Sequence, residues 1–409
     1  MFARFWKPLV FAFVAVNLGL IMFGKTYVYK AVIYQSPNID DIGLFPHRTV
    51  AAGTQALPWA KANDYNQQPY PKTLIDTLEY FDTTQFLVIQ NNQLKTEKYW
   101  EGYAPDDPSR DYKNSNSFSA AKSIVSVLIG AALQQGYIES IDQPVADYVE
   151  SFKNGAKADI TIRQVLEMTS GLDFMEAYKK LLSDTAEAYY GKDLRAQIDA
   201  LGIEEVPGTT WRYKSGDTQV LALVLEAATN KTLSQFASEA LWSKIGAEHD
   251  AQWSLDDENG LEKAYCCFYS NARDFARIAA LYMNAGKSPF GEQIVPVSYV
   301  QQSVVPNGVP EPEKRAPSHW YGLQWWTLFY EGYPIFYARG ILGQYVLAIP
   351  DLEMIIVRLG HRRSEVKVNH HPTDVYAILD GVFEMFAVPL EADEFDNLAH
   401  QAKHTAVAQ

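Results

Sequence analysis

Residues Ser119 to Tyr137 read SAAKSIVSVLIGAALQQGY, a stretch that is almost continuously apolar apart from small hydroxyl groups and that ends at Gly136. A run of this kind predicts a helix buried in the core of the protein. Residues three apart on a helix share a face, so we expect the Ser119 hydroxyl and the Lys122 amine to point into the same space. The same stretch is therefore expected to form the central helix of the fold and to carry a candidate nucleophile.

The Ser-x-x-Lys tetrad has the requirements of an activated nucleophile. Apolar surroundings lower the pKa of a lysine and let it act as a base. At a helix N-terminus, the N–H of Ser119 can also help to hold a developing oxyanion. The tetrad occurs a second time, from Ser364 to Lys367, in the charged run HRRSEVK, which predicts a solvated loop. From the tetrad alone, a helix N-cap is an equally good interpretation of Ser119.

Strand and helix signals surround the buried stretch on both sides. Phe86 to Tyr99 (FLVIQNNQLKTEKY) predicts a hairpin that turns at Asn91-Asn92. Helical patterns dominate from about 141 to 295, and strand signals return in GLQWWTLF (322–329), QYVLAIP (344–350) and MIIVRLG (354–360). Asp374 to Phe386 closes the chain as an amphipathic helix. The pattern predicts one split α/β domain that holds an all-helical lobe.

Two further segments carry possible chemistry. Residues 207–215 read PGTTWRYKS, and Tyr213 could transfer protons there if nearby cations lowered its pKa from about 10. A loop tyrosine packed on the surface is the plainer interpretation. Residues 338–344 read ARGILGQ and enter the strand Tyr345 to Ile349. Glycines beside a strand let a ligand approach the backbone, although a simple β-turn would also use them.

In this order the three motifs resemble the serine β-lactamase-related family, which includes class C β-lactamases, D-alanyl-D-alanine peptidases, esterases and 6-aminohexanoate-oligomer hydrolases. Four flanking stretches look like that family too: ITIRQVLEMTSGL (160–172), PGTTWRYKSGDTQVLALVLE (207–226), NARDFARIAALYMNAG (271–286) and YGLQWW (321–326). The resemblance covers roughly residues 80 to 388. It implies a β-lactamase/transpeptidase-like α/β (α+β) fold, with an antiparallel sheet flanked by helices.

The resemblance also implies roles for particular residues and a hydrolase that works through a covalent acyl-enzyme, without a metal or another cofactor. Ser119 would be the nucleophile, Lys122 its base and Tyr213 the acid and base for the leaving group and the water. The backbone N–H groups of Ser119 and Ile341 would form the oxyanion hole. The residues expected to contact substrate are Ser215, Gly340, Gly343 and Gln344.

Two departures from the family pattern bear on the substrate. Ala338 stands where β-lactamases and the peptidases carry a lysine or similar polar residue that helps to bind the substrate carboxylate, and Arg339 is the only cation near it in the sequence. Ser215 stands where class C β-lactamases carry asparagine. We therefore expect a small carboxylic ester or simple amide as substrate. A β-lactamase or D-alanyl-D-alanine peptidase on the same scaffold, and a non-catalytic binding protein that keeps the fold, are the alternatives.

The N-terminus differs from the rest of the chain. Pro8 to Gly24 read PLVFAFVAVNLGLIMFG, with basic residues on both sides, which favours an uncleaved, single-pass signal anchor over a cleaved signal. The predicted division is an anchor at 1–26, a polar connector at 27–75, a catalytic domain at 76–388 and a tail at 389–409. In a bacterium the anchor would lie in the inner membrane, with the catalytic domain on the periplasmic side.

Composition excludes several other classes of protein. The net charge of −14 and the sequence pI of about 5.1 argue against nucleic-acid binding. The two cysteines, Cys266 and Cys267, are adjacent; since neighbouring cysteines rarely form a relaxed disulfide, we expect two small core residues. His361, His370 and His371 lack a metal-ligand spacing and are expected in a surface loop. Nothing in the sequence indicates an oligomeric state.

Overall fold

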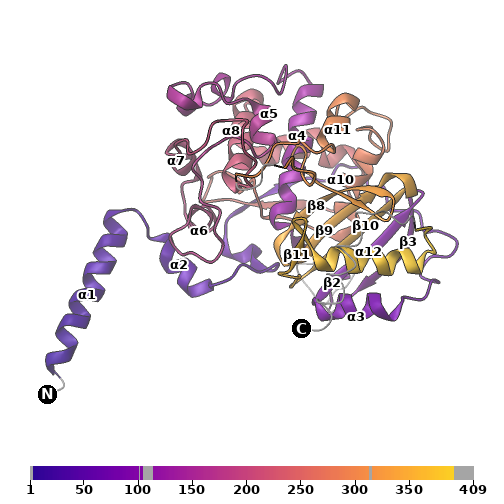
Figure 1. Cartoon of the computed structure of the whole chain (residues 1–409), viewed down its shortest axis with the longest axis horizontal. Helices are drawn as coiled ribbons and strands as arrows, with labels where there is room; N and C mark the ends of the chain where they lie inside the picture. The colour runs from indigo at the N-terminus through magenta and orange to yellow at the C-terminus, as the bar shows by residue number, and fades with distance from the viewer. Residues whose placement is uncertain (1–2, 101, 105–113, 313–315, 391–409) are drawn as a thin grey trace.

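The computed structural model describes residues 3–100, 102–104, 114–312 and 316–390. A six-stranded antiparallel sheet lies in the order β3-β2-β10-β9-β8-β7 (Figure 1). Its strands are β2 (Thr83–Gln90), β3 (Gln93–Tyr99), β7 (Trp326–Tyr330), β8 (Tyr333–Gly340), β9 (Gln344–Ile349) and β10 (Met354–Gly360). The N-terminal hairpin joins the C-terminal strands through β2 and β10, so the predicted split domain and its antiparallel sheet are confirmed.

The alternation of side chains along the strands lets helices cover both faces of the sheet. Phe86 and Val88 face α3 (Lys72–Tyr80) and α12 (Thr373–Met385), in one of the two hydrophobic cores. Leu87 and Ile89 belong to the larger core, which includes α4 (Ala121–Gln134), α8 (Ser215–Thr229) and α10 (Ala272–Met283). The predicted C-terminal helix is α12, and the predicted buried helix is α4.

The helical half of the molecule lies beyond α4, where α8 packs against it (Figure 1). Its helices are α5 (Ile162–Leu166), α6 (Asp184–Tyr190), α7 (Leu194–Asp199) and α9 (Leu233–Ala240), and α11 (Val297–Ser303) also packs on α4. The predicted range of 141–295 differs from the structure in two respects. It includes β5 (Ala251–Ser254) and β6 (Phe268–Ser270), and α10 packs on β9 and β10 of the large sheet. These two strands are too short to show a period in the sequence.

The segment predicted as a polar connector, 27–75, is part of the folded body. It forms α2 (Tyr27–Tyr34), which packs on α6, and β1 (His47–Val50). Strand β1 pairs with β5 in a second sheet of order β1-β5-β6-β4, where β4 is Ser115–Asn116. Ile39 and Val50 are fully buried. Isolated apolar residues in a polar segment carry no period, which is why the sequence pattern hides this packing.

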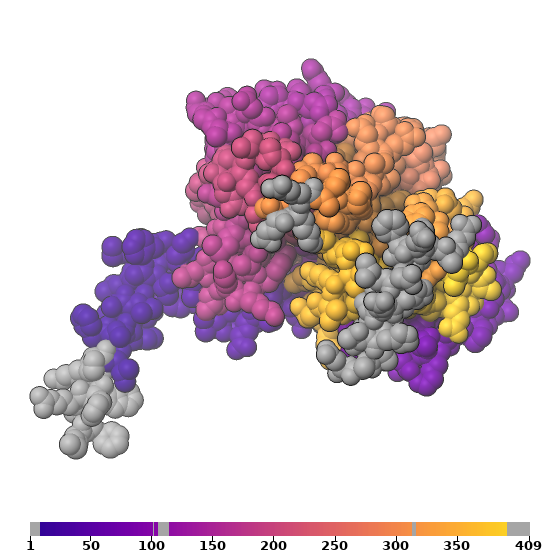
Figure 2. Space-filling model, viewed as in Figure 1, coloured from indigo at the N-terminus to yellow at the C-terminus, as the bar shows by residue number. Residues whose placement is uncertain are grey.

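Helix α1 (Ala3–Met22) stands away from the rest of the molecule (Figures 1 and 2). Among the described residues, no single helix is both long and apolar enough to span a membrane. Leu9–Met22 and Tyr27–Tyr34 meet that test only as a pair, and the pair is bent by 117°. The expected single membrane helix is therefore not supported by the structure. Of the predicted tail, 391–409 lie outside the described residues.

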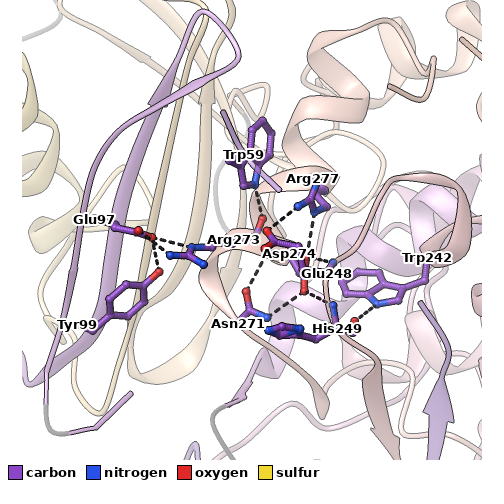
Figure 3. A network of polar contacts seen from close by, with 10 residues as sticks. All are labelled: Trp59, Glu97, Tyr99, Trp242, Glu248, His249, Asn271, Arg273, Asp274 and Arg277. Carbon is purple, nitrogen blue, oxygen red and sulfur yellow. Dashed lines mark hydrogen bonds and ion pairs between the residues drawn. The ribbon is translucent and has the colours of Figure 1, made fainter. Parts of the chain in front are cut away.

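A polar network holds the start of α10 between the two sheets (Figure 3). The Arg273 guanidinium donates two hydrogen bonds, at 2.7 and 2.8 Å, to the Glu97 carboxylate on β3. Asn271 caps the helix by accepting from the N–H of Asp274, and Asp274 accepts from the backbone of Glu248 at 2.8 Å. Because these groups are largely buried, their charges are compensated only within this arrangement. The network fixes the position of α10 relative to the large sheet.

Candidate active site

Ser119 lies in a single 3-10 turn, Phe118–Ala120, that leads directly into α4. Phe118 has a left-handed backbone, with φ of 43°, and its N–H donates to the Asn116 side chain at 2.8 Å. A non-glycine residue keeps such a conformation only where the surroundings hold it. The tight turn between β4 and α4 places the Ser119 side chain at the edge of a cleft.

Lys122 follows Ser119 by one turn and is buried. Its Nζ lies 3.2 Å from the Ser119 Oγ and 3.2 Å from the Ser215 Oγ, and it donates to the Tyr265 carbonyl at 2.9 Å. Burial lowers the pKa of Lys122 to about 8, while the nearby charges of Glu176 and Asp217 oppose that shift. The structure therefore brings the hydroxyl and a lysine with a lowered pKa together, as the tetrad predicts.

Tyr213 approaches the same centre from the loop that leads into α8. The loop is anchored by the Arg212 N–H, which donates to the Met168 carbonyl at 2.9 Å. The Tyr213 ring lies 5.1 Å from the Lys122 Nζ. Burial, together with the charge of Glu176, raises the pKa of Tyr213 well above its ordinary value, and the Ser119 hydroxyl, Arg339 and Arg363 oppose that shift in part. Cations are therefore present near this phenol, but the net pKa of Tyr213 is raised and not lowered as the sequence argument required.

The end of β8 packs against the turn that carries Ser119. A Cβ at Gly340 would lie 2.2 Å from the Ser117 carbonyl oxygen, so only glycine allows this approach. Gly340 and Ile341 line the cleft together with Ser119. The two N–H groups expected to form the oxyanion hole, those of Ser119 and Ile341, therefore belong to segments in direct contact.

The cleft has a volume of about 370 Å³. Most of its lining is aromatic or charged: Tyr178, Trp211, Arg212, Tyr213, Glu311, Trp326, Arg339, Arg363, Lys367 and His370. Arg339, at the end of β8, stacks over Trp326 at 3.2 Å from the ring centroid. An aromatic wall with a few fixed polar groups is typical of a small-molecule site.

Three of the four residues expected to contact substrate have other partners. Ser215 is buried and holds Lys122. The Arg358 guanidinium packs against Gly343 and donates to its carbonyl at 2.9 Å. The Gln344 amide donates to the Gly360 carbonyl at 2.7 Å and its oxygen accepts from the Gly360 N–H at 3.2 Å. These three residues have partners inside the fold and do not line the cleft, whereas Gly340 does.

The segment between α5 and α6 supplies two residues that sequence reasoning missed. Glu176 accepts hydrogen bonds from the Ser215 N–H at 2.7 Å and from its hydroxyl at 2.8 Å. The Tyr178 hydroxyl also donates to Glu176, and the Tyr178 side chain lines the cleft. No local motif marks them, because Glu176 acts through Ser215, 39 positions further along the chain, and Tyr178 acts through Glu176.

The adjacent cysteines form a disulfide, Cys266–Cys267, contrary to the expectation of two unpaired core residues. They are buried, as expected, in a tight turn where the Cys266 N–H donates to the Lys263 carbonyl at 3.0 Å. This turn folds the two side chains together, which the sequence alone does not indicate. Tyr265, whose carbonyl accepts from Lys122, directly precedes the disulfide.

The C-terminal residues expected in surface loops lie deeper than predicted. His371 is buried and its Nδ1 lies 2.7 Å from the Tyr337 hydroxyl, while His370 lines the cleft. Ser364 is also buried, and its hydroxyl bonds to Thr373 at 2.7 Å. The second Ser-x-x-Lys is not helical, so its serine and lysine share no face. Within the described part of the chain, no cluster of His, Cys, Asp or Glu is suited to hold a metal ion.

Comparisons with known proteins identify relatives of this chain. A family model described as Beta-lactamase matches residues 73–379. Among curated proteins, the 6-aminohexanoate-dimer hydrolase of Paenarthrobacter ureafaciens is 28% identical over 298 residues, which is 69% of this chain and 73% of that protein.

Solved structures show the same fold. A candidate 6-aminohexanoate-dimer hydrolase from Bacillus anthracis superposes with a TM-score of 0.70 at 21% identity, over 90% of this chain and 94% of that chain. A family VIII carboxylesterase superposes with a TM-score of 0.59 at 16% identity, over 77% of this chain and 98% of that chain. At these identities the likeness concerns the fold alone.

Proposed function

The chain belongs to the beta-lactamase family and is a serine hydrolase of that family, and we propose that it cleaves a carboxylic ester or a simple amide through an acyl-enzyme on Ser119. One observation carries the proposal: the Lys122 Nζ, buried and with a pKa lowered to about 8, lies 3.2 Å from the Ser119 Oγ at the edge of the cleft. A neutral amine at that distance is a general base for the hydroxyl.

Acylation begins with the neutral form of Lys122. The amine takes the proton of Ser119 as its Oγ bonds to the substrate carbonyl carbon, and the carbonyl π electrons move onto oxygen. The N–H groups of Ser119 and Ile341 stabilise that oxyanion. Ser215 and Tyr265 hold the Lys122 amine in place, at 3.2 and 2.9 Å.

Collapse of the tetrahedral species breaks the bond to the leaving group. Tyr213 gives its proton to the departing oxygen or nitrogen, and the lysinium of Lys122 restores the proton to the phenol. In deacylation the same groups act in reverse. Tyr213 passes its phenol proton to the neutral Lys122 amine as it takes a proton from water, and the hydroxide adds to the ester carbonyl. The lysinium of Lys122 then gives its proton to the Ser119 oxygen, which leaves as a hydroxyl, and the acid product is released.

Burial raises the pKa of Tyr213 well above its ordinary value and Glu176 adds to that shift, while the Ser119 hydroxyl, Arg339 and Arg363 oppose it only in part. Tyr213 therefore acts as a neutral phenol that relays protons.

An ester or simple amide fits the cleft better than a β-lactam or a peptidoglycan stem. Ala338, at the position where those enzymes carry a lysine or similar polar residue, has no charge of its own, and the adjacent Arg339 stacks over Trp326. The curated relative is named a 6-aminohexanoate-dimer hydrolase, and two such amino acids are joined through an amide, which supports the amide alternative. The experiments below separate this proposal from its three alternatives: a β-lactamase, a D-alanyl-D-alanine peptidase and a non-catalytic binding protein.

The test is intact-mass spectrometry after treatment with a fluorophosphonate, with Ser119→Ala as the control. We expect one adduct on the wild-type chain and none on the variant. No adduct on the wild type, or an equal one on Ser119→Ala, removes the nucleophile and favours a binding protein. Parallel assays compare short p-nitrophenyl esters with a chromogenic cephalosporin, and faster turnover of the cephalosporin would identify a β-lactamase.

We also propose that the N-terminal arm anchors the enzyme in the bacterial inner membrane, with the catalytic body on the periplasmic side. Phe11 and Phe13 on α1 are 77% and 69% exposed, and α1 stands away from the body (Figure 2). These two rings, and the exposed aliphatic side chains of the same helix, are costly in water and favourable in lipid. Protease treatment of spheroplasts tests the orientation: digestion of the body is expected, and its full protection would contradict the proposal.

A further inference from the structure

A buried arginine contacts the turn that carries one half of the proposed oxyanion hole. Arg358 lies on β10, and its side chain is fully buried. The turn is Ile341–Gly343, between β8 and β9. The Arg358 guanidinium donates to the carbonyls of Leu342 and Gly343, at 3.0 and 2.9 Å. It therefore holds the backbone directly after the Ile341 N–H.

The backbone of this turn needs such support. Leu342 has φ of 62° and Gly343 has φ of 85°, so two successive residues are left-handed. Glycine adopts this conformation freely, whereas leucine keeps it only where the surroundings hold it. The third carbonyl of the turn, that of Ile341, accepts from the Gln344 amide at 3.2 Å. Because peptide groups are planar and linked through few dihedral angles, holding these carbonyls also fixes the direction of the Ile341 N–H.

The other hydrogen bonds of Arg358 fix the guanidinium to different segments. Its Nε donates to the Thr83 hydroxyl at 2.9 Å, at the start of β2, and the guanidinium also donates to the Phe81 carbonyl. A further hydrogen bond, at 2.8 Å, goes to the Arg362 carbonyl after the end of β10. A guanidinium is planar and presents its donors in a fixed fork, so it cannot rotate without losing several of these bonds. The side chain is thus a rigid link between the start of β2 and the turn.

Two glycines leave room for this side chain. A Cβ at Gly343 would lie 1.9 Å from the Arg358 Nη1, and a Cβ at Gly360 would lie 2.5 Å from its Nη2. Carbon and nitrogen atoms that are not bonded do not approach so closely, so the absence of a side chain at both positions is required. The backbone therefore closes on the guanidinium at the turn and again at the end of β10.

In the described part of the chain, each hydrogen bond of Arg358 goes to a carbonyl or hydroxyl oxygen. Burial lowers the pKa of Arg358, and the charges of Asp374 and Asp82 oppose that shift. Burying a charge without a hydrogen-bonded counter-ion is costly, and an apolar side chain would fill the same space at a lower cost. What the guanidinium alone supplies is a set of donors for the turn.

We propose that Arg358 is a positioning residue for the oxyanion hole: its guanidinium holds the Leu342 and Gly343 carbonyls so that the Ile341 N–H faces the cleft. This inference rests on the proposed function. Ile341 lines the cleft together with Ser119, whereas Arg358 does not. Arg358 therefore acts on the reaction only through the backbone that it holds.

The experiment measures how strongly the enzyme prefers a carbonyl oxygen over a sulfur atom. 4-Nitrophenyl butyrate is compared with O-4-nitrophenyl thionobutyrate, in which C=S replaces C=O and the leaving group is the same. Sulfur is larger and accepts hydrogen bonds weakly, so N–H groups placed for an oxyanion stabilise it poorly. The oxygen preference is the ratio of the two kcat/KM values, divided by the same ratio for hydrolysis by hydroxide. A smaller folded fraction lowers both kcat/KM values alike and cancels in the ratio.

We expect Arg358→Gln to lower the oxygen preference about tenfold, because a misplaced N–H loses part of its contribution to the transition state. Arg358→Lys keeps the charge but not the fork of donors, and should lower the preference about threefold. The lysine variant decides the question if Arg358→Gln does not fold.

The matched control is Thr83→Val. It removes one hydrogen bond of the same guanidinium and leaves those to Leu342 and Gly343. We expect the wild-type oxygen preference in this variant, together with a lower melting temperature.

A wild-type preference in the folded Arg358 variants would overturn the inference, and so would an equal fall in Thr83→Val, which would indicate a general loss of packing. A preference near one in the wild-type enzyme would also overturn it, because no oxyanion hole would then be in place. Fluorophosphonate labelling separates these results from a failure of the proposed function. If Ser119 is labelled, the serine hydrolase stands without this role for Arg358. If Ser119 is not labelled, the proposed nucleophile is wrong.

Discussion

The carboxylate of Glu176 accepts two hydrogen bonds from Ser215, one from its N–H at 2.7 Å and one from its hydroxyl at 2.8 Å. Ser215 in turn lies 3.2 Å from the Lys122 Nζ. Glu176 therefore acts on the lysine in two ways: it fixes the serine that holds the amine, and its negative charge favours the protonated amine. It is a positioning residue for the proposed base.

Glu176→Gln should separate these two effects. Glutamine can still accept from Ser215, but it no longer stabilises the lysinium, so the pKa of Lys122 should fall further. We expect the rising limb of the kcat/KM profile to move to lower pH by about half a unit. The matched control is Glu187→Gln. Glu187 lies on α6 and forms an ion pair with Lys25, away from the site. A limb that stays in place in Glu176→Gln would contradict the electrostatic role.

The wild-type enzyme should show a single rising limb governed by Lys122. Burial lowers the pKa of this group to about 8, and the base is its neutral form. Activity should therefore be low below pH 8, fall about tenfold for each further unit, and level off above it. Burst kinetics with a non-ionisable p-nitrophenyl ester between pH 5.5 and 9.5 measures the acylation step. A plateau already reached at pH 6.5 would exclude Lys122 as the base.

Gly340→Ala should damage the oxyanion hole without touching a side chain of the site. The new Cβ would lie 2.2 Å from the Ser117 carbonyl oxygen, so the end of β8 must move away from the Ser119 turn. We expect kcat to fall about 100-fold and the free energy of unfolding to fall by about 1–3 kcal/mol. Gly43→Ala, where nothing lies within 4 Å of the added atom, is the control. Wild-type kcat in Gly340→Ala would show that the strand end is not part of the hole.

Gln344→Ala distinguishes a structural role from the substrate contact expected from the sequence. The side chain bonds to both backbone groups of Gly360 and is buried, so its loss leaves these groups without partners. We expect a loss of about 2–4 kcal/mol in the free energy of unfolding measured in urea. Gln93→Ala on the exposed end of β3 should lose far less. A large rise in KM with wild-type stability would restore the role in substrate binding.

The parts of the fold that were predicted correctly depend on short-range patterns. The hairpin turn at Asn91-Asn92 has positive φ at both positions, 53° and 59°, which asparagine tolerates. Strand β8 was not identified as a strand, because Pro334 and Arg339 interrupt its apolar pattern. Its neighbour β9 supplies the pairing and the burial that override this local signal.

The residues of the candidate site also fall into two groups: those that local spacing or a motif indicates, and those whose contacts depend on packing. Ser119 and Lys122 are three residues apart on one helical turn, so their contact follows from the period of the helix. Tyr213 and Gly340 were found because family motifs mark them. Ser215, Gly343 and Gln344 lie within the same motifs, and their contacts inside the fold, which the motifs do not indicate, come from the packing of separate elements.

The sequence by itself determined the buried helix, its Ser-x-x-Lys face and the strands that flank it, because spacing along one element fixes which side chains are neighbours. The tertiary structure alone decided which distant residues surround that face. Glu176 reaches Ser215 across the helical lobe, and Arg363 and Lys367 meet Arg339 across the sheet edge. Such contacts depend on how separate elements pack, and no period in the chain encodes them.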